Sequence, residues 1–385
     1  MDYRKRVLQA LNHEVSDRTP VDFLATPEIW EKLIRHFDIA QADTLQGFFD
    51  PAWEEVLRKL DVDCRVVSYD QFCKPPESLF EADEREEWWD VMGRSTPARM
   101  WRRVKDGEYA RCIFGRLFKR VKNETGVYES NVDVLADASC VDDLKQHCWP
   151  DPDWWDFSAL PSVIKEINGE NRYHIRYRIG TVFELAWQLR GLDTFFMDLA
   201  LNPDMVEYML DRITDILCEV TERALSAGKD LIDMVYFYDD VASNSNLLIS
   251  KDMWNQFIRP RHEKIIAVAK RYDTSIMYHS DGALRTLLPE LIDMGIDVLN
   301  PIQPDAAGMA LRGLKDDFGD RLCFHGGIDI KETLPKGSVD DVRAEVADRI
   351  GILGESGGYI MASSHHIQSD TPLENVLAMY DFEEK

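Results

Sequence analysis

The second half of the chain alternates short apolar runs with stretches whose apolar residues recur at helical spacing, and this pattern limits the fold more than any other feature. After residue 171 it predicts one β/α unit after another around a parallel sheet. The strand-like runs are His174–Ile179, Met234–Tyr238, Ser275–Tyr278, Val298–Ile302, Leu322–Phe324 and Tyr359–Ala362.

Two earlier runs, Val21–Ala25 and Val62–Tyr69, bring the predicted strands to about eight, the number in a closed (β/α)8 barrel. An open doubly wound sheet is the alternative, but no Gly-x-Gly-x-x-Gly motif follows the first run. We therefore predict an α/β fold of the (β/α)8 TIM barrel class, with residues 1–385 forming a single barrel domain.

Residues 74–160 interrupt this pattern with a highly charged, Trp-rich stretch after the second strand. We expect an inserted, β-containing elaboration that packs on the barrel. Its Trp residues should face inward or lie in the contact of a homodimer, because exposed Trp clusters are rare elsewhere on a soluble protein. The predicted strands of a small β-meander are Arg99–Val104, Tyr109–Phe114 and Phe118–Val121. The Trp residues concerned are Trp88, Trp89 and Trp101.

The charge balance excludes several kinds of partner. The net charge is −25, and no basic stripe offsets it, so we expect no nucleic acid and no anionic membrane surface as a partner. No apolar run reaches membrane-spanning length, and no signal-peptide core follows the first residues. The seven Cys contain no Cys-x-x-Cys pair, which indicates reduced thiols and a cytoplasmic protein.

Polar residues follow the predicted strands at the points where a barrel carries its active site. Because these ends meet at one mouth, the residues there are the candidates for chemistry. They are Glu184, Asp239, Asp240, His279, Asp281, Asn300, Gln303, His325, His365 and His366.

His279 and Asp281 form the most informative pair. They are two residues apart at a strand end, so their side chains point to the same side. An imidazole and a carboxylate so placed can hold a divalent metal or relay a proton. The alternative is that His279 forms a hydrogen bond in the core while Asp281 caps the following helix.

The other candidates have plain alternatives too. Asp239 and Asp240 are adjacent, so only one can face the barrel axis, and the same reasoning allows only one of His365 and His366 to serve the site. Glu184 is either an acid of the site or a first-turn carboxylate favoured by the helix dipole.

Several motifs together resemble the uroporphyrinogen decarboxylase superfamily. The similarity covers most of the chain outside residues 74–160 and is greatest to the methyltransferase-like branch, which serves corrinoid-dependent methyl transfer. It implies a (β/α)8 barrel. The motifs are Asp17-Arg18-Thr19-Pro20-Val21, Gly180-Thr181-Val182-Phe183-Glu184-Leu185-Ala186-Trp187, Tyr238-Asp239-Asp240, His279-Ser280-Asp281-Gly282, and Gly358-Tyr359-Ile360-Met361-Ala362 followed by Asp370-Thr371-Pro372.

The sequence departs from this family's patterns in two ways. Uroporphyrinogen decarboxylases grip substrate carboxylates with an Arg-containing motif after the first strand, whereas residues 23–28 here contain no Arg, so we expect a cleft lined with Asp and Glu. The thiol-alkylating methyltransferases hold zinc with His-x-Cys and a distant Cys. The matching positions here are His279, Asp281 and His365, which the resemblance implies as a zinc site with an open position.

The resemblance implies a methyltransferase that moves a methyl group from a small methylated substrate to a corrinoid carried by a partner protein. In this hypothesis zinc, or a protonated His, activates the leaving atom. Asp240 or Asp239 orients His279, and Glu184 is a further ligand or acid, with His325 as another candidate catalytic residue. The alternatives are a decarboxylase or lyase acting on a small acid, and a non-catalytic barrel that binds a small molecule.

Overall fold

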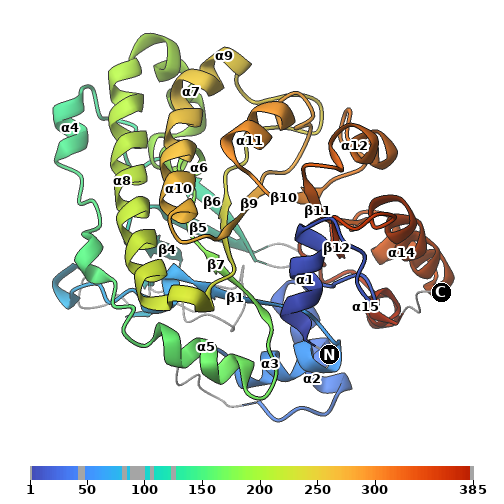
Figure 1. Ribbon diagram of the computed structural model, residues 1–385. Coiled ribbons are helices and arrows are strands. Elements are labelled where there is room, and N and C mark those ends of the chain that lie inside the picture. Colours follow the sequence, from blue (N-terminus) through green and yellow to red (C-terminus); the bar gives the residue numbers. More distant parts are fainter. Residues whose placement is uncertain are drawn as a thin grey trace.

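Seven parallel strands form a curved sheet at the centre of the molecule (Figure 1). The computed structural model describes residues 2–41, 48–79, 85–86, 100–104, 108–122 and 127–381. The order β1-β7-β8-β9-β10-β11-β12 follows the chain, as in a barrel of β/α units. The strands are β1 Cys64–Ser68, β7 His174–Arg178, β8 Met234–Tyr238, β9 Ser275–His279, β10 Val298–Ile302, β11 Cys323–Ile328 and β12 Tyr359–Ser363. The predicted TIM barrel class is confirmed.

The predicted first strand is wrong as a strand, although its residues occupy the eighth position of the barrel. Val21 and Ala25 form isolated parallel bridges to Met361 and Ile367. On the other side, the carboxylate of Asp63 accepts the Val21 N–H at 2.8 Å, and the Asp63 N–H donates to the Val21 carbonyl at 3.0 Å. A side chain therefore takes up the N–H that a ladder with β1 would use, and regular pairing does not continue.

Helices cover the outside of the sheet (Figure 1). The longest, α8, begins at Pro203, since proline suits a first helical turn, and ends at Gly228. The helices are α1 Tyr3–Leu11, α2 Pro27–His36, α3 Pro51–Lys59, α4 Val141–Lys145, α5 Leu160–Asn168, α6 Phe183–Arg190, α7 Leu192–Leu201, α8 Pro203–Gly228, α9 Lys251–Met253, α10 Arg259–Lys270, α11 Leu288–Met294, α12 Leu311–Phe318, α13 Thr333–Lys336, α14 Val339–Leu353 and α15 Leu373–Tyr380.

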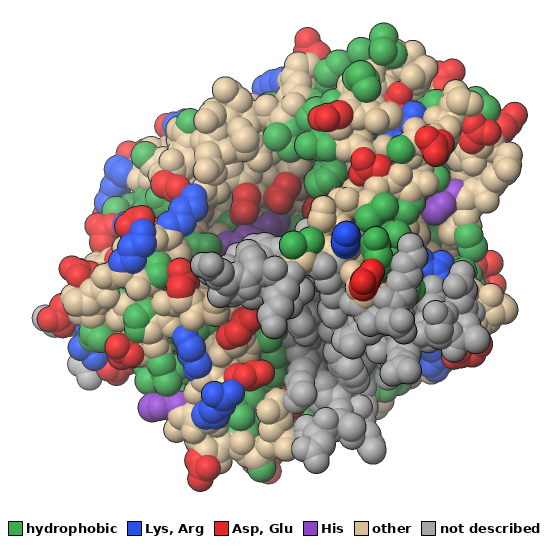
Figure 2. Space-filling model, turned by 180° about the vertical axis from the view of Figure 1, so that it is seen from behind, with side chains coloured by type: hydrophobic (Ala, Val, Ile, Leu, Met, Phe, Trp, Pro, Cys, Tyr) green, Lys and Arg blue, Asp and Glu red, His purple; other side chains and the backbone are tan. Residues whose placement is uncertain are grey.

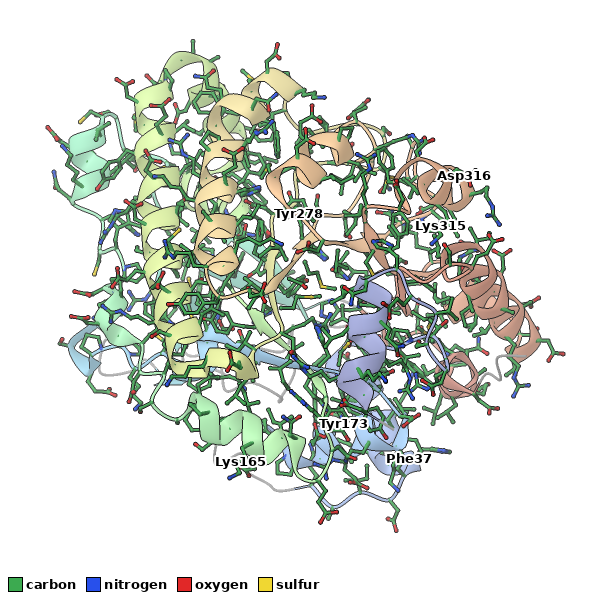
Figure 3. The ribbon with its side chains drawn as sticks, in the orientation of Figure 1. Phe37, Lys165, Tyr173, Tyr278, Lys315 and Asp316 are labelled. Carbon is green, nitrogen blue, oxygen red and sulfur yellow. The ribbon has the colours of Figure 1, made fainter. Side chains whose placement is uncertain are left out.

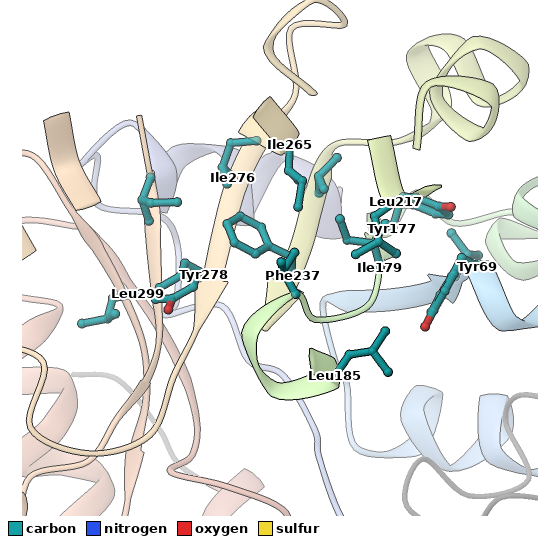
Figure 4. Packing of buried hydrophobic residues seen from close by; sticks show 14 of the residues in the cluster. Tyr69, Tyr177, Ile179, Leu185, Leu217, Phe237, Ile265, Ile276, Tyr278 and Leu299 are labelled. Atoms are coloured by element: carbon teal, nitrogen blue, oxygen red, sulfur yellow. The ribbon is translucent and has the colours of Figure 1, made fainter. Parts of the chain in front are cut away.

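The alternation of side chains along each strand separates two cores. The larger core lies between the sheet and the helices, where Ile276 and Tyr278 of β9 pack with Ile265 of α10 and Phe237 of β8 (Figure 4). Tyr278 is completely buried, whereas Lys165 of α5 and Asp316 of α12 lie at the periphery (Figure 3). The strands thus direct one set of side chains outward into this core and the other set into the barrel.

A smaller core closes the amino-terminal end of the barrel. Val7 and Ala10 of α1 pack there against inward-facing residues from six strands. Those residues are Cys64, Met234, Met277, Val298, Cys323 and Ile360. Because this end is filled, the polar residues further along the strands lie toward the opposite mouth.

Residues 74–160 contain a second sheet, of five antiparallel strands in chain order. They are β2 Arg85–Glu86, β3 Trp101–Val104, β4 Tyr109–Cys112, β5 Leu117–Lys122 and β6 Val127–Val132, so the three predicted strands of a meander are present. Trp101 is buried and stacks on Phe118 with ring centroids 5.6 Å apart, whereas Trp88 and Trp89 lie outside the described residues. That 74–160 is an insertion into a single barrel domain remains our proposal.

In the part of the chain that the structure describes, no helix is both long enough and apolar enough to cross a membrane.

Candidate active site

A cavity of about 340 Å³ opens at the carboxyl ends of the barrel strands. In Figure 2, His side chains lie at the bottom of a hollow beside acidic side chains. Of the ten predicted residues, seven line this cavity, and Asp239, Asp281 and Gln303 do not. The seven are Glu184, Asp240, His279, Asn300, His325, His365 and His366.

His279, Asp281 and His365 converge as their positions in the sequence predicted. Each offers a ligand atom within 4.8 Å of the others. Nε2 of His279 lies 4.0 Å from Asp281 Oδ1, and Nε2 of His365 lies 3.9 Å from Asp281 Oδ2. These distances are too long for hydrogen bonds but leave room for an ion bound by all three residues.

The alternative role of Asp281 as a helix cap is wrong. The next helix, α11, begins at Leu288 and has Leu287 at its N-cap. Instead, Asp281 Oδ1 is buried with no hydrogen-bond partner in the described residues. A buried carboxylate oxygen without a partner is costly, so the donor set fits a cation such as Zn²⁺, which accepts imidazole and carboxylate ligands.

A chain of hydrogen bonds fixes the orientation of His279. Its Nδ1–H donates to Asn300 Oδ1 at 2.6 Å, and Asn300 Nδ2 donates to His325 Nδ1 at 2.6 Å. His325 Nε2–H then donates to Asp22 Oδ2 at 2.8 Å. His279 Nε2 is therefore left with its lone pair toward the cavity, as a metal ligand or a base requires. Asp22 was not identified from the sequence, since it lies inside the presumed first strand.

Asp22 stays ionised at the end of this chain. Burial alone would raise the pKa of Asp22, but the neighbouring Arg176 and His325 outweigh it and hold that pKa well below the ordinary value. Burial lowers the pKa of His325. A neutral His325 is thus anchored by an anionic Asp22, which also forms an ion pair with Arg176.

Asp239 and Asp240 divide two roles between them, as their adjacency predicted. Asp239 is fully buried and faces α6, where it accepts the N–H groups of Phe183 at 2.9 Å and Glu184 at 2.8 Å. Asp239 also accepts a hydrogen bond from the Nε2–H of His262 at 2.8 Å. Asp240 lines the cavity, with its Oδ1 3.8 Å from His279 Nε2. We therefore assign Asp239 to positioning α6.

Glu184 lies in the first turn of α6 and faces the cavity. Burial, with a smaller effect of the negative charge on Asp240, raises the pKa of Glu184 to about 7. Its Oε1 accepts a hydrogen bond from Gln188 Nε2 at 2.7 Å. A carboxyl group with this pKa can donate a proton near neutral pH.

His365 and His366 both line the cavity. Of the two, His365 joins the cluster with His279 and Asp281, and that only one of them serves the site stays a prediction. They follow β12 in irregular backbone rather than in extended strand, and their Nδ1 atoms are 3.3 Å apart. Burial lowers the pKa of both rings, and for His366 well below the ordinary value. Neutral imidazoles are the form that binds metal.

Asp and Glu side chains line the cavity, as expected, and three arginines line it as well. Arg176 and Arg178 project inward from β7, and Arg116 comes from the second sheet. Arg176 pairs with Asp22, and Arg178 pairs with Asp70 at 2.8 Å. The alternation His-Ile-Arg-Tyr-Arg in a buried strand could have indicated the two β7 arginines, because its polar residues share one face.

The family model described as uroporphyrinogen decarboxylase (URO-D) matches residues 163–385, more than half of the chain. The chain belongs to the uroporphyrinogen decarboxylase family. The match begins in α5 and includes β7 to β12, and thus every strand end that carries a predicted site residue. No curated protein matches the chain.

One solved structure supports the fold of this member of the uroporphyrinogen decarboxylase family. A methyltransferase from Methanosarcina mazei has a TM-score of 0.61 and 19% identity, covering 98% of this chain and 97% of that one. A GH10 endoxylanase from a sugarcane soil metagenome has a TM-score of 0.36 and 10% identity, covering 59% and 82%, a similarity too low to indicate a common fold.

Proposed function

We propose that the protein is a methyltransferase that transfers a methyl group from a small methylated substrate to a corrinoid carried by a partner protein. The observation that carries this proposal is the cluster of His279, Asp281 and His365 at the open mouth of a uroporphyrinogen decarboxylase-family barrel. The name of the Methanosarcina structure, a methyltransferase of the same fold, supports the choice of reaction.

In this proposal the three residues of the cluster hold Zn²⁺ and leave one position open. Bound zinc would supply Lewis acidity at the oxygen, nitrogen or sulfur atom from which the methyl group departs. Asn300 holds His279 in the tautomer that a ligand needs, and Asp240 lies beside it to accept a hydrogen bond or to add a ligand.

Glu184 serves as the acid. When the methyl group leaves with no electrons of its former bond, the leaving atom keeps the electron pair and needs a proton. Glu184 reaches the cavity and, with a pKa of about 7, is partly protonated at neutral pH. A cavity of about 340 Å³ suits a small substrate.

A second candidate is a decarboxylase or lyase acting on a small acid. The arginines of the cavity favour it, since guanidinium groups bind carboxylates well. In that case His279 and Asp240 would act in proton transfer without a metal.

Elemental analysis for zinc separates the two. We expect about one zinc per chain in the wild type under metal-replete conditions, and loss of that zinc in His279→Ala and in His365→Ala. His36→Ala, which changes an exposed residue of α2, should keep the metal. Equal zinc in wild type and His279→Ala, or none in either, would exclude the zinc-assisted reaction.

A further inference from the structure

Arg116 differs from every other buried arginine in the described part of the chain. Seven arginines are buried there, and six of them form an ion pair with a carboxylate. Within the described ranges Arg116 has no such pair. The six paired arginines are Arg6, Arg65, Arg176, Arg178, Arg190 and Arg261.

The surroundings of Arg116 hold its guanidinium at the cavity wall. One amino group donates to Gln188 Oε1 at 2.6 Å. The guanidinium carbon lies 5.0 Å from the ring centroid of Trp101 and 5.9 Å from that of Phe118. Nε is buried and has no hydrogen-bond partner among the described residues. Gln188 and the aromatic rings thus hold the guanidinium in place. Nε–H, one of the donors that a guanidinium uses to bind a carboxylate through two hydrogen bonds, remains unused.

Among the described residues, no carboxylate forms an ion pair with Arg116. Tyr69 and Tyr238 line the cavity beside Arg116, and burial raises the pKa of both, that of Tyr238 to about 12. They are therefore neutral near pH 7. Glu184 is close enough for the charge on Arg116 to lower its pKa, but burial outweighs this effect and raises that pKa to about 7. In the described residues Glu184 forms no ion pair with Arg116, and Gln188 bonds to both side chains. A buried cation without a counter-ion is strongly destabilising, and an anionic ligand would remove that cost.

We propose that Arg116 is the residue that recognises the substrate, by binding a carboxylate that the substrate carries. This inference rests on the proposed function in one respect, namely that the substrate occupies this cavity. Arg116 belongs to the turn between β4 and β5, so the second sheet provides the recognition of the substrate while the barrel provides the chemistry.

A carboxylate fits better than a phosphate. One guanidinium neutralises a single negative charge, and its planar fork matches the two oxygens of a carboxylate. A dianion would leave excess negative charge beside Glu184 and Asp240, which line the same cavity. The adjacent walls are formed by the rings of Tyr69, Trp101, Phe118 and Tyr238. We therefore expect the part of the substrate that bears the carboxylate to be flat and apolar.

Benzoate and its neutral analogue benzamide test the proposal by calorimetry on the full chain after treatment with a chelator, so that no metal contributes. We expect wild type to bind benzoate more tightly than benzamide, and Arg116→Gln to lose about tenfold or more of the benzoate affinity. Arg116→Lys should retain part of it. Arg111→Gln, on the neighbouring strand and outside the cavity lining, is the matched control and should bind as wild type does.

Thermal unfolding gives a second readout. Because Arg116→Gln removes an unpaired buried charge, the ligand-free variant should melt at or above the wild-type temperature, and benzoate should raise the Tm of the wild type alone. A marked drop in Tm of the variant would indicate a structural role and overturn the proposal. So would equal benzoate affinity in wild type and Arg116→Gln, equal binding of benzamide, or no benzoate binding by the wild type. Inorganic phosphate binding as tightly as benzoate would overturn the carboxylate assignment.

These results are independent of the zinc measurement. Benzoate binding that depends on Arg116, together with no zinc in the wild type under metal-replete conditions, would support the subsite and reject zinc-assisted methyl transfer. If zinc content depends on His279 but benzoate affinity does not depend on Arg116, the subsite is rejected and the proposed methyltransferase function is retained.

Discussion

Glu184 ties the stability of the protein to pH. Its pKa rises from 4.5 to about 7 on folding, because burial and Asp240 disfavour the carboxylate. The stability due to the neutral form is therefore fully present below pH 4.5 and is lost as the pH rises through 7. Relative to Glu184→Gln, we expect the wild type to lose up to roughly 3 kcal/mol of unfolding free energy between these limits. Urea unfolding of both proteins at pH 5 and pH 8 measures this.

Glu374→Gln is the matched control, because Glu374 is exposed in the first turn of α15. Its unfolding free energy should follow that of the wild type at both pH values. If the unfolding free energy of Glu184→Gln changes between pH 5 and pH 8 by as much as that of the wild type, the assignment of Glu184 as a neutral acid is rejected.

Asn300 should control metal affinity without touching the metal. In Asn300→Leu the Nδ1–H of His279 loses its acceptor, so the ring is free to change tautomer. We expect zinc affinity to fall by about 10- to 100-fold, measured by competition with a chromogenic chelator. Asn244→Ala, an exposed change near the mouth, should bind zinc as the wild type does, and unchanged affinity in Asn300→Leu would argue against His279 as a ligand.

At the residue scale, spacing along the chain predicted the convergence of His279, Asp281 and His365, because strand ends in a barrel must meet. It could not predict Asp22 or Arg116. Asp22 was hidden in a run that was interpreted as apolar, and Arg116 reaches the cavity from another sheet. Contacts between separate sheets leave no periodic signal in a sequence.

At the scale of one element, α6 depends on Asp239. The carboxylate accepts backbone N–H groups at the start of the helix and also bonds to Thr181 and His262. Asp239→Asn should therefore cost about 3 kcal/mol of unfolding free energy. The adjacent Asp240→Asn should change it by less than about 1 kcal/mol, because an amide oxygen still accepts the Asp281 N–H. Denaturant unfolding of the two variants tests the division of roles, and equal losses would contradict it.

The strands themselves were predictable to different degrees. The runs from His174 onward became strands close to the expected limits, since buried parallel strands have a strong apolar signal. Val21–Ala25 has the same signal, yet the side chain of Asp63 takes its N–H. Apolar pattern predicts burial, and it does not reveal which partner satisfies the backbone.

At the scale of the whole molecule, α1 seals one end of the barrel. Val7 is completely buried against the ends of several strands, so Val7→Ala should lower the unfolding free energy by about 2 kcal/mol. Lys5→Ala, an exposed change on the same helix, should stay within about 0.5 kcal/mol of the wild type. Urea unfolding followed by Trp fluorescence measures both. Equal effects would mean that α1 does not contribute to the barrel core.

The hydrogen-bond chain from His279 to Asp22 has one more consequence. An imidazole can pass a proton from one ring nitrogen to the other, but the amide of Asn300 between the two rings cannot readily do so. Asn300 therefore fixes the orientation of both imidazole rings but prevents proton transfer from one ring to the other. Any proton that His279 gains or loses during a reaction must travel through the cavity, and the buried charge on Asp22 is never discharged by the chemistry at the mouth.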